Sequence, residues 1–149
     1  MKPAIISHHR AIFASLLSQE PDLEYAAGEA IFESHEPAEF AVYLISGRVT
    51  INMVLDDATR ITVASRDGQE LVGEMGLVSG VRFCEVRAIE RVRAVRVSYA
   101  LITQLVNARA DFAIALYTLA TARLEEVCRL AAAQANDGLK SNRIPRREN

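Results

Sequence analysis

The chain is expected to fold as an α+β domain that is mainly β: an antiparallel β-roll, or jelly roll, with helices at both ends. Short β-rich runs separated by turn residues occupy roughly residues 23–97, a pattern typical of antiparallel sandwiches and rolls. One short amphipathic segment precedes these runs, and two helical segments follow them, the last one long. With 149 residues, the chain is long enough for one ordinary domain with its own core.

The N-terminal helix is predicted over residues 7–18. Its apolar residues, Ile12, Phe13, Leu16 and Leu17, lie at helical spacing. Pro21 ends the helix, because the residue before a proline is disfavoured in the helical region.

The strands of the roll are predicted from β-branched and aromatic runs between turn signals. A glycine at position 47 favours a tight hairpin at 46–48, because glycine tolerates positive φ. A second hairpin is expected at 56–58. The predicted strands are 30–32, 41–45, 49–55 and 60–64, followed by further β structure between 84 and 97.

Two helices are predicted after the roll. Ser98 is a suitable N-cap for a short helix that carries Leu101, Ile102 and Leu105. Asp111 is expected to cap a longer helix that runs to about residue 135 and stops at 136–138. We therefore expect one domain over residues 1–138 and a flexible basic tail over 139–149.

Composition excludes several classes of protein. The chain is 24% charged with a net charge of −2, which gives no general electrostatic reason to hold nucleic acid. No apolar run approaches the roughly 20 residues that span a membrane, and no secretory signal is recognised at the N-terminus. A cytoplasmic location is therefore expected, with Cys84 and Cys128 as reduced thiols.

Catalysis is not expected. A metal-dependent jelly roll needs histidines close together on its strands, whereas the three histidines here are His8, His9 and His35, with no His-x-His in the roll. Neither cysteine has a histidine within plausible reach in the sequence, and no Gly-x-Ser-x-Gly motif occurs. The sequence therefore predicts a protein that is not an enzyme and holds no metal.

The stretch from residue 72 to 88, VGEMGLVSGVRFCEVRA, carries the candidate binding site. Gly73 to Leu77 are expected to form one helical turn whose first amides are free for an anion. Arg82 lies where it could close over the same anion with a charge-assisted bond. Glu74 would be repelled by the anion but could accept a hydrogen bond from a neighbouring sugar hydroxyl. The pattern fits a small ligand with one negative charge beside a hydroxyl, although a plain turn between two strands is the simpler interpretation of the spacing alone.

The order of these elements resembles the cyclic nucleotide-binding domain found in catabolite activator protein and in kinase regulatory subunits. That family usually carries Gly-Glu-x-Ala-Leu followed by Pro-Arg-Ser/Thr-Ala, and residues 73–77 and 82–84 stand in those places. Residues 28–32 and 42–49 are similar to its early strands. The resemblance covers roughly residues 5–135.

By this resemblance, a cyclic nucleotide, cAMP or cGMP, is the expected ligand. Glu74 would hold the ribose 2′-hydroxyl and Arg82 the cyclic phosphate, helped by nearby backbone amides. The family's last helix also offers hydroxyl groups to the base, but the corresponding place here, near Val127 and Cys128, supplies no strong donor. Recognition of the base is therefore expected to differ from the family, with Arg123 or Thr121 as candidates. The candidate ligand-binding residues are Gly73, Glu74, Met75, Gly76, Leu77, Arg82, Phe83 and Cys84.

Two functions remain open from the sequence. In the first, the protein is a stand-alone sensor that relays nucleotide binding through its C-terminal helices to an unidentified downstream protein. In the second, the roll is degenerate and the protein is a dimeric scaffold or interaction module. The retained Glu74 and Arg82 favour the sensor, whereas Phe83 and Glu85 at family positions that are usually small or hydroxylated favour the scaffold.

The long helix also predicts how the chain associates. Its apolar residues lie nearly all round the helix between 112 and 130, so it needs burial on more than one side. We expect a homodimer through the 111–135 helix; the alternative is a monomer whose helix lies entirely against its own roll. Too few residues follow the helix for a helix-turn-helix module, so direct DNA binding is not expected.

Overall fold

The computed structural model describes residues 8–141. Two four-stranded antiparallel sheets form a β-roll, with strand orders β1-β8-β3-β6 and β2-β7-β4-β5. The predicted class, a mainly β roll with a short N-terminal helix and a long C-terminal helix, is therefore confirmed. The helices are α1 (His9–Leu17), α2 (Gly76–Ser79), α3 (Tyr99–Ala108) and α4 (Ala110–Ser141). The strands are β1 (Leu23–Tyr25), β2 (Ala30–Phe32), β3 (Phe40–Ser46), β4 (Arg48–Val54), β5 (Arg60–Asp67), β6 (Leu71–Val72), β7 (Glu85–Ala88) and β8 (Val92–Ser98).

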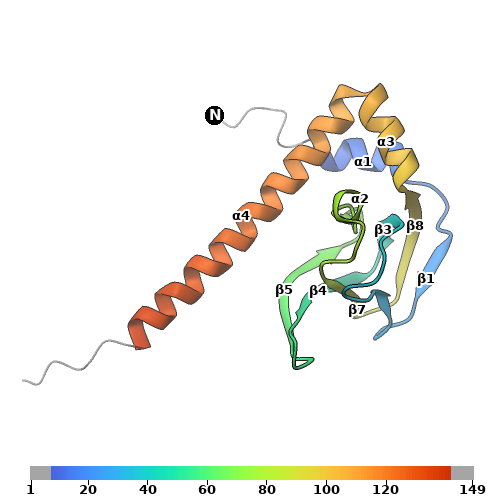
Figure 1. The fold of residues 1–149 in the computed structure, drawn as a ribbon. Helices are drawn as coiled ribbons and strands as arrows, with labels where there is room; N and C mark the ends of the chain where they lie inside the picture. The colour runs from blue at the N-terminus through green and yellow to red at the C-terminus, as the bar shows by residue number, and fades with distance from the viewer. Residues whose placement is uncertain (1–7, 142–149) are drawn as a thin grey trace, which may run out of the picture.

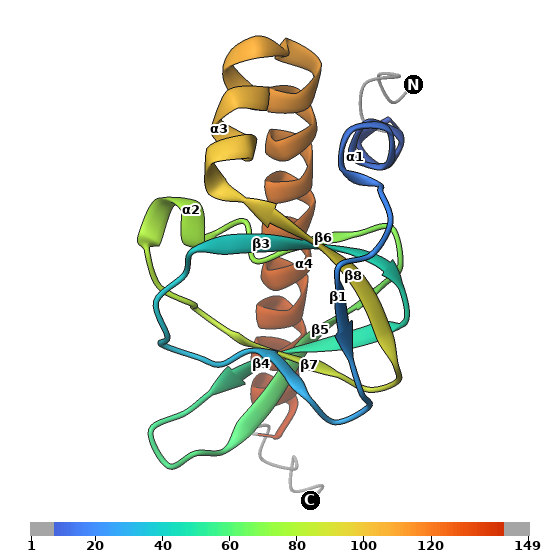
Figure 2. The ribbon, with the colours of Figure 1, turned by 90° about the vertical axis from the view of Figure 1, so that its right-hand side faces the viewer.

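The helices lie at one end and on one side of the roll. In Figure 1, α1, α3 and the first part of α4 gather at one end of the roll, while the rest of α4 slants past one side of the roll and its C-terminal end stands away from it. Figure 2, turned by 90°, shows α4 passing behind both sheets. No helix within residues 8–141 is long and apolar enough to cross a membrane.

The middle of strand β3, residues 41–44, is buried on both faces. Ala41 and Tyr43 pack with α1, α3 and α4 in one apolar cluster. Val42 and Leu44, which alternate with them, pack inside the roll against β4, β7 and β8. Since side chains alternate along a strand, a strand between two apolar layers becomes a continuous apolar run.

The predicted hairpins are present. Gly47 joins β3 to β4 with φ +95°, and a Cβ there would lie 2.3 Å from the carbonyl oxygen of Arg91. No other residue fits this turn without strain. Strands β1 and β6 are short elements that the sequence did not single out.

The C-terminal helices begin nearly as predicted. The side chain of Ser98 accepts a hydrogen bond of 3.1 Å from the amide of Leu101, which confirms the predicted N-cap. Helix α4 begins one residue before the predicted cap, so Asp111 lies in its first turn, where its carboxylate accepts from the amide of Phe112.

The predicted helix stop at residues 136–138 is wrong, because α4 continues to Ser141. A single glycine in a helix costs only about 1 kcal/mol relative to alanine, which the surrounding helix formers offset. At 32 residues, α4 is about 48 Å long at 1.5 Å per residue. The rest of the predicted tail, residues 142–149, and the start of the predicted first helix, residue 7, lie outside the described residues.

One buried hydroxyl in the core leads to a prediction. Tyr43 is completely buried, and among residues 8–141 its hydroxyl has no hydrogen-bond partner. Removing a buried, unpaired polar group removes its desolvation cost.

Tyr43→Phe is therefore expected to leave the free energy of unfolding unchanged or to raise it by up to about 1 kcal/mol. Urea unfolding followed by circular dichroism measures this, since the chain contains no tryptophan. A loss larger than about 1 kcal/mol would mean that the hydroxyl is bonded after all.

Candidate ligand-binding site

A cavity of about 390 Å³ lies between the β2-β7-β4-β5 sheet, the segment around α2, and α4. Its volume is within the range of small-molecule sites, roughly 300–1,000 Å³. Most of its wall is apolar, with five charged residues among the lining. The apolar lining includes Phe32, Ile51, Met53, Val63, Ala64, Val72, Val81, Val86, Val127 and Leu130, and the charged lining is Arg66, Glu74, Arg82, Arg123 and Glu126.

The fold brings nearly all of the predicted site residues to this cavity. The eight candidates come from one stretch of chain that leaves β6, forms α2 and enters β7. Leu77 is not part of the wall, whereas the other seven candidates are: Gly73, Glu74, Met75, Gly76, Arg82, Phe83 and Cys84.

Arg82 is the most deeply buried charged group in the wall, with an exposed fraction of only 5%. Its Nη2 donates to the carbonyl oxygen of Phe40 at 2.6 Å. Its Nη1 donates to the carbonyl oxygen of Gly73 at 3.2 Å and to the hydroxyl of Tyr99 at 3.1 Å. The guanidinium carbon lies 3.5 Å from the centre of the Phe32 ring, which favours a cation–π contact.

In the described part of the chain, no carboxylate neutralises Arg82 directly. Within residues 8–141, no ion pair reaches its guanidinium; neutral oxygens accept its hydrogen bonds instead. Burial lowers the pKa of Arg82 from its ordinary value, but an arginine remains protonated in a protein. The wall of the cavity therefore contains a buried positive charge without a counter-charge, an arrangement that is costly unless an anion binds beside it.

Glu74, by contrast, is already paired. Its carboxylate accepts from Nη1 of Arg123 at 2.6 Å, with the two side chains 16% and 19% exposed. Arg123 reaches across from α4 and also donates through Nη2 to the carbonyl oxygen of Leu71 on β6. This ion pair connects Glu74, the residue predicted to bind the ribose hydroxyl, to the long helix α4.

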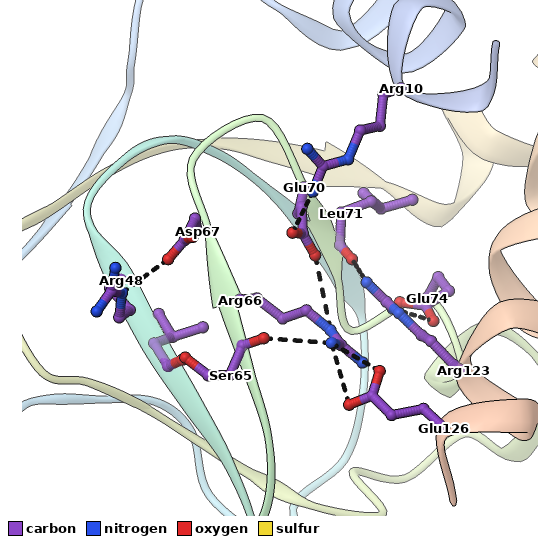
Figure 3. Close-up of polar contacts among 11 residues, drawn as sticks. Arg10, Arg48, Ser65, Arg66, Asp67, Glu70, Leu71, Glu74, Arg123 and Glu126 are labelled. Carbon is purple, nitrogen blue, oxygen red and sulfur yellow. Dashed lines mark hydrogen bonds and ion pairs between the residues drawn. The ribbon is translucent and has the colours of Figure 1, made fainter. Parts of the chain in front are cut away.

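A second ion pair links the roll to α4 beside the first. Arg66 of β5 lies 3.0 Å from the carboxylate of Glu126 and 3.6 Å from that of Glu70. Glu70 in turn accepts from Arg10 of α1 at 2.6 Å. Figure 3 shows these residues forming one chain of charges from α1 through the roll to α4.

The charged wall therefore carries an excess of one positive charge. It contains three arginines and two glutamates. The glutamates pair with Arg66 and Arg123, so the excess lies at Arg82.

The backbone next to Arg82 also has free donors. The amides of Phe83 and Cys84 donate to no oxygen within the described part of the chain. The amide of Leu77, in contrast, is used inside the turn, where it donates to the carbonyl oxygen of Glu74 at 3.1 Å. The Phe83 side chain is 57% exposed, and it offers no hydrogen-bond donor where the family usually has a hydroxyl.

Glu85 faces away from the cavity. Strand β7 directs Val86 into the wall, and Glu85, its neighbour, points to the opposite face of the sheet. There it accepts hydrogen bonds from Asn52, Arg60 and Arg87 at 3.0–3.1 Å. Glu85, which counted in favour of a scaffold in the sequence, therefore does not bring a second carboxylate into the site.

Three residues near the site were missed or misplaced by the sequence. Tyr99 and Phe40 contact Arg82, but nothing in their local sequence indicates this. Thr121, considered as a base contact, instead donates to the carbonyl oxygen of Tyr117 on its own helix and lies outside the cavity wall. Arg123, the other residue considered for contact with the base, does lie in the cavity wall. It is one helical turn beyond Leu119, which packs in the core.

The family model of the cyclic nucleotide-binding domain matches residues 22–109. The chain therefore belongs to the cyclic nucleotide-binding domain family, whose members are typically regulatory rather than catalytic. No group of three or more potential metal ligands among His, Cys, Asp and Glu occurs in the described part of the chain.

Solved structures with the same fold include CLP, a c-di-GMP-responsive global regulator of Xanthomonas campestris. CLP is 26% identical, with a TM-score of 0.70 over 87% of this chain and 64% of its own. A cyclic nucleotide-binding domain from Methylobacillus flagellatus is 19% identical, with a TM-score of 0.65 over 74% of this chain and 65% of its own. The sensor domain of the transcriptional regulator DNR from Pseudomonas aeruginosa is 20% identical, with a TM-score of 0.64 over 80% of this chain and 85% of its own. No curated protein sequence gives a significant match.

The cluster around Glu85 generates a pH prediction. Three donors stabilise its ionised form, with Arg87 first, and lower the pKa of Glu85 from 4.5 to about 2. Because the folded-state pKa is depressed, the stabilisation is present above the unfolded-state pKa and is lost as the pH falls from about 5 to 2.

Glu85→Gln should therefore lower the free energy of unfolding by about 3 kcal/mol at pH 7 and by progressively less toward pH 2. Urea unfolding at several pH values measures the difference. Glu125→Gln, at an exposed ion pair with Arg129, is the control and should have little effect at any pH. A loss for Glu85→Gln that does not change with pH would contradict this account.

Proposed function

We propose that this protein is a regulatory sensor whose cavity binds a cyclic mononucleotide, cAMP or cGMP. The observation that carries the proposal is the buried guanidinium of Arg82, 5% exposed and without a carboxylate partner in the described part of the chain. A buried cation of this kind is stabilised by a bound anion. The free amides of Phe83 and Cys84 beside it add neutral donors for the same anion.

The charge of the cavity supports a ligand with one negative charge. A cyclic 3′,5′-phosphodiester carries one such charge, which matches the single uncompensated arginine. The sugar hydroxyl of the ligand would meet Glu74, and the purine would lie against the apolar part of the wall formed by residues of β4, β5 and α4. Flat, apolar-faced bases are suited to such a surface.

Cyclic di-GMP is a weaker candidate for this chain, although the regulator CLP responds to it. Two phosphodiester groups would bring two negative charges to a cavity that has an excess of one positive charge. Placing the second charge among Glu74 and Glu126 would be repulsive.

Nucleotide binding would be relayed through α4. The ribose hydroxyl competes with Arg123 for Glu74, and this ion pair is one of two that hold α4 against the roll near the cavity. Weakening it shifts the balance between arrangements of the helix. A downstream protein that recognises α4 would then detect the ligand.

A dimeric scaffold without a nucleotide is the second candidate. Two observations favour it. Glu74, the residue predicted to bind the ribose hydroxyl, is already paired with Arg123 of the same chain. Phe83 also lacks the hydroxyl that the family usually has at this position. The sensor and the scaffold therefore differ in whether Arg82 binds an anion.

Isothermal titration with cAMP, cGMP and cyclic di-GMP distinguishes the two candidates. We expect micromolar binding of a cyclic mononucleotide by the unaltered protein and a loss of about 100-fold in Arg82→Ala, because hydrogen bonds to a charged group contribute up to about 3 kcal/mol. Arg91→Ala removes an exposed arginine outside the cavity and should bind normally. Equal affinity in Arg82→Ala and the unaltered protein would refute the site, and no binding by the unaltered protein would favour the scaffold.

We further propose that α4 forms a homodimer. On the side away from the roll, Tyr117 and Leu124 are 75% and 64% exposed, and they lie seven residues apart, so they share one face of the helix. Thr121 and Cys128 continue this face and are also exposed. Phe112, Ala115 and Leu119 of the opposite face are buried in the core. An apolar stripe of this kind in a long helix favours pairing with a second copy.

Leu124→Asp tests the dimer, because it places a charge in the middle of the stripe, where pairing would bury it. Light scattering should give twice the chain mass of 16.4 kDa for the unaltered protein and the mass of one chain for the variant. Arg129→Asp introduces the same side chain at an exposed position off the stripe and should remain a dimer. An unaltered protein with the mass of one chain at micromolar concentration would exclude the dimer.

A further inference from the structure

Tyr99 connects the anion site to α3. It is the first residue of that helix, directly after the N-cap Ser98, and its ring extends back toward the roll. Its hydroxyl donates to the carbonyl oxygen of Gly73 at 2.7 Å and accepts from Nη1 of Arg82 at 3.1 Å. Tyr99 itself is not part of the cavity wall.

These contacts hold one end of the Arg82 guanidinium. Both hydrogens of Nη1 are used, one by Tyr99 and one by the carbonyl oxygen of Gly73. Nη2 donates to Phe40, and Nε has no partner within residues 8–141. The guanidinium is planar and its five donors form a rigid fork, so fixing Nη1 also fixes the direction of the donors that remain for a ligand.

The phenol also determines the position of the turn around α2. A Cβ at Gly76 would lie 2.3 Å from the Tyr99 hydroxyl and 2.4 Å from the side chain of Ala38. The hydroxyl therefore occupies the space that an alanine methyl would need, and this chain has glycine where the family usually has alanine. Gly76 and Tyr99 fit together as one unit behind the anion site.

We propose that Tyr99 is a positioning residue for anion binding, holding Arg82 so that its free donors meet the phosphodiester. The inference rests on the proposed function. Affinity for the phosphodiester depends on the Tyr99 hydroxyl, whereas recognition of the ribose hydroxyl by Glu74 does not. Because Tyr99 begins α3, the anion site is also mechanically joined to this helix.

The test compares Tyr99→Phe with the unaltered protein by titration with the proposed nucleotide and three analogues. The analogues are the 2′-deoxy nucleotide, which lacks the ribose hydroxyl, and the two diastereomeric phosphorothioates, which exchange one phosphate oxygen for sulfur. Tyr43→Phe is the matched control, because it removes a tyrosine hydroxyl that has no partner in the described part of the chain.

We expect Tyr99→Phe to bind the nucleotide about tenfold more weakly, as for loss of one hydrogen bond to a charged group. Loss of the 2′-hydroxyl should weaken binding by the same factor in Tyr99→Phe as in the unaltered protein. The ratio of affinities for the two phosphorothioates should be closer to one in Tyr99→Phe. A purely structural defect would weaken all four ligands by the same factor, and that result would overturn the inference.

A second measurement uses the absorbance of tyrosine. An anion bound beside Arg82 would change the electrostatic field at the Tyr99 hydroxyl, which is hydrogen-bonded to Arg82. The ultraviolet difference spectrum should therefore contain a tyrosine signal that is absent in Tyr99→Phe and retained in Tyr43→Phe. Normal nucleotide affinity in Tyr99→Phe would overturn the role of Tyr99 alone. Absence of binding by the unaltered protein would overturn the proposed function, and the inference with it.

Discussion

A permanently charged guanidinium buried in the wall of the roll imposes the main constraint on this structure. Arg82 is held by carbonyl oxygens of Gly73 and Phe40, by the phenol of Tyr99 and by the face of the Phe32 ring. These groups stabilise a cation without cancelling its charge. The arrangement therefore keeps a positive potential inside a mostly apolar cavity, which suits a ligand that has one anionic group and a large apolar surface.

The long helix is attached to the roll by two different kinds of contact. Near its beginning, Phe112, Ala115 and Leu119 pack in the core with α1 and β3, and apolar burial of this kind is not sensitive to a ligand. Beside the cavity, the contacts are the ion pairs of Arg123 and Arg66 with carboxylates. The helix is thus held by apolar packing near its beginning and by ion pairs beside the cavity.

Glu74 and Glu85, which precede and follow Arg82 in the sequence, lie in different surroundings because of strand geometry and helix packing. Glu74 remains at the cavity and is neutralised by Arg123. Glu85 is directed to the outer face of the sheet, where Arg60, Arg87 and Asn52 hold it ionised. Within residues 8–141, this separation of the charges leaves Arg82 as the charge of the wall without an ion-pair partner.

The sequence by itself determined the order of elements, the hairpin at Gly47, the Ser98 cap and the stretch that carries Gly73, Glu74 and Arg82. These features depend on alternation, turn chemistry and capping, which act between near neighbours in the chain. Only the tertiary structure decided which groups meet Arg82 and Glu74, because Phe40, Tyr99 and Arg123 lie 42, 17 and 49 residues away from them. Contacts over such separations are set by strand register and helix packing, and no local pattern records them.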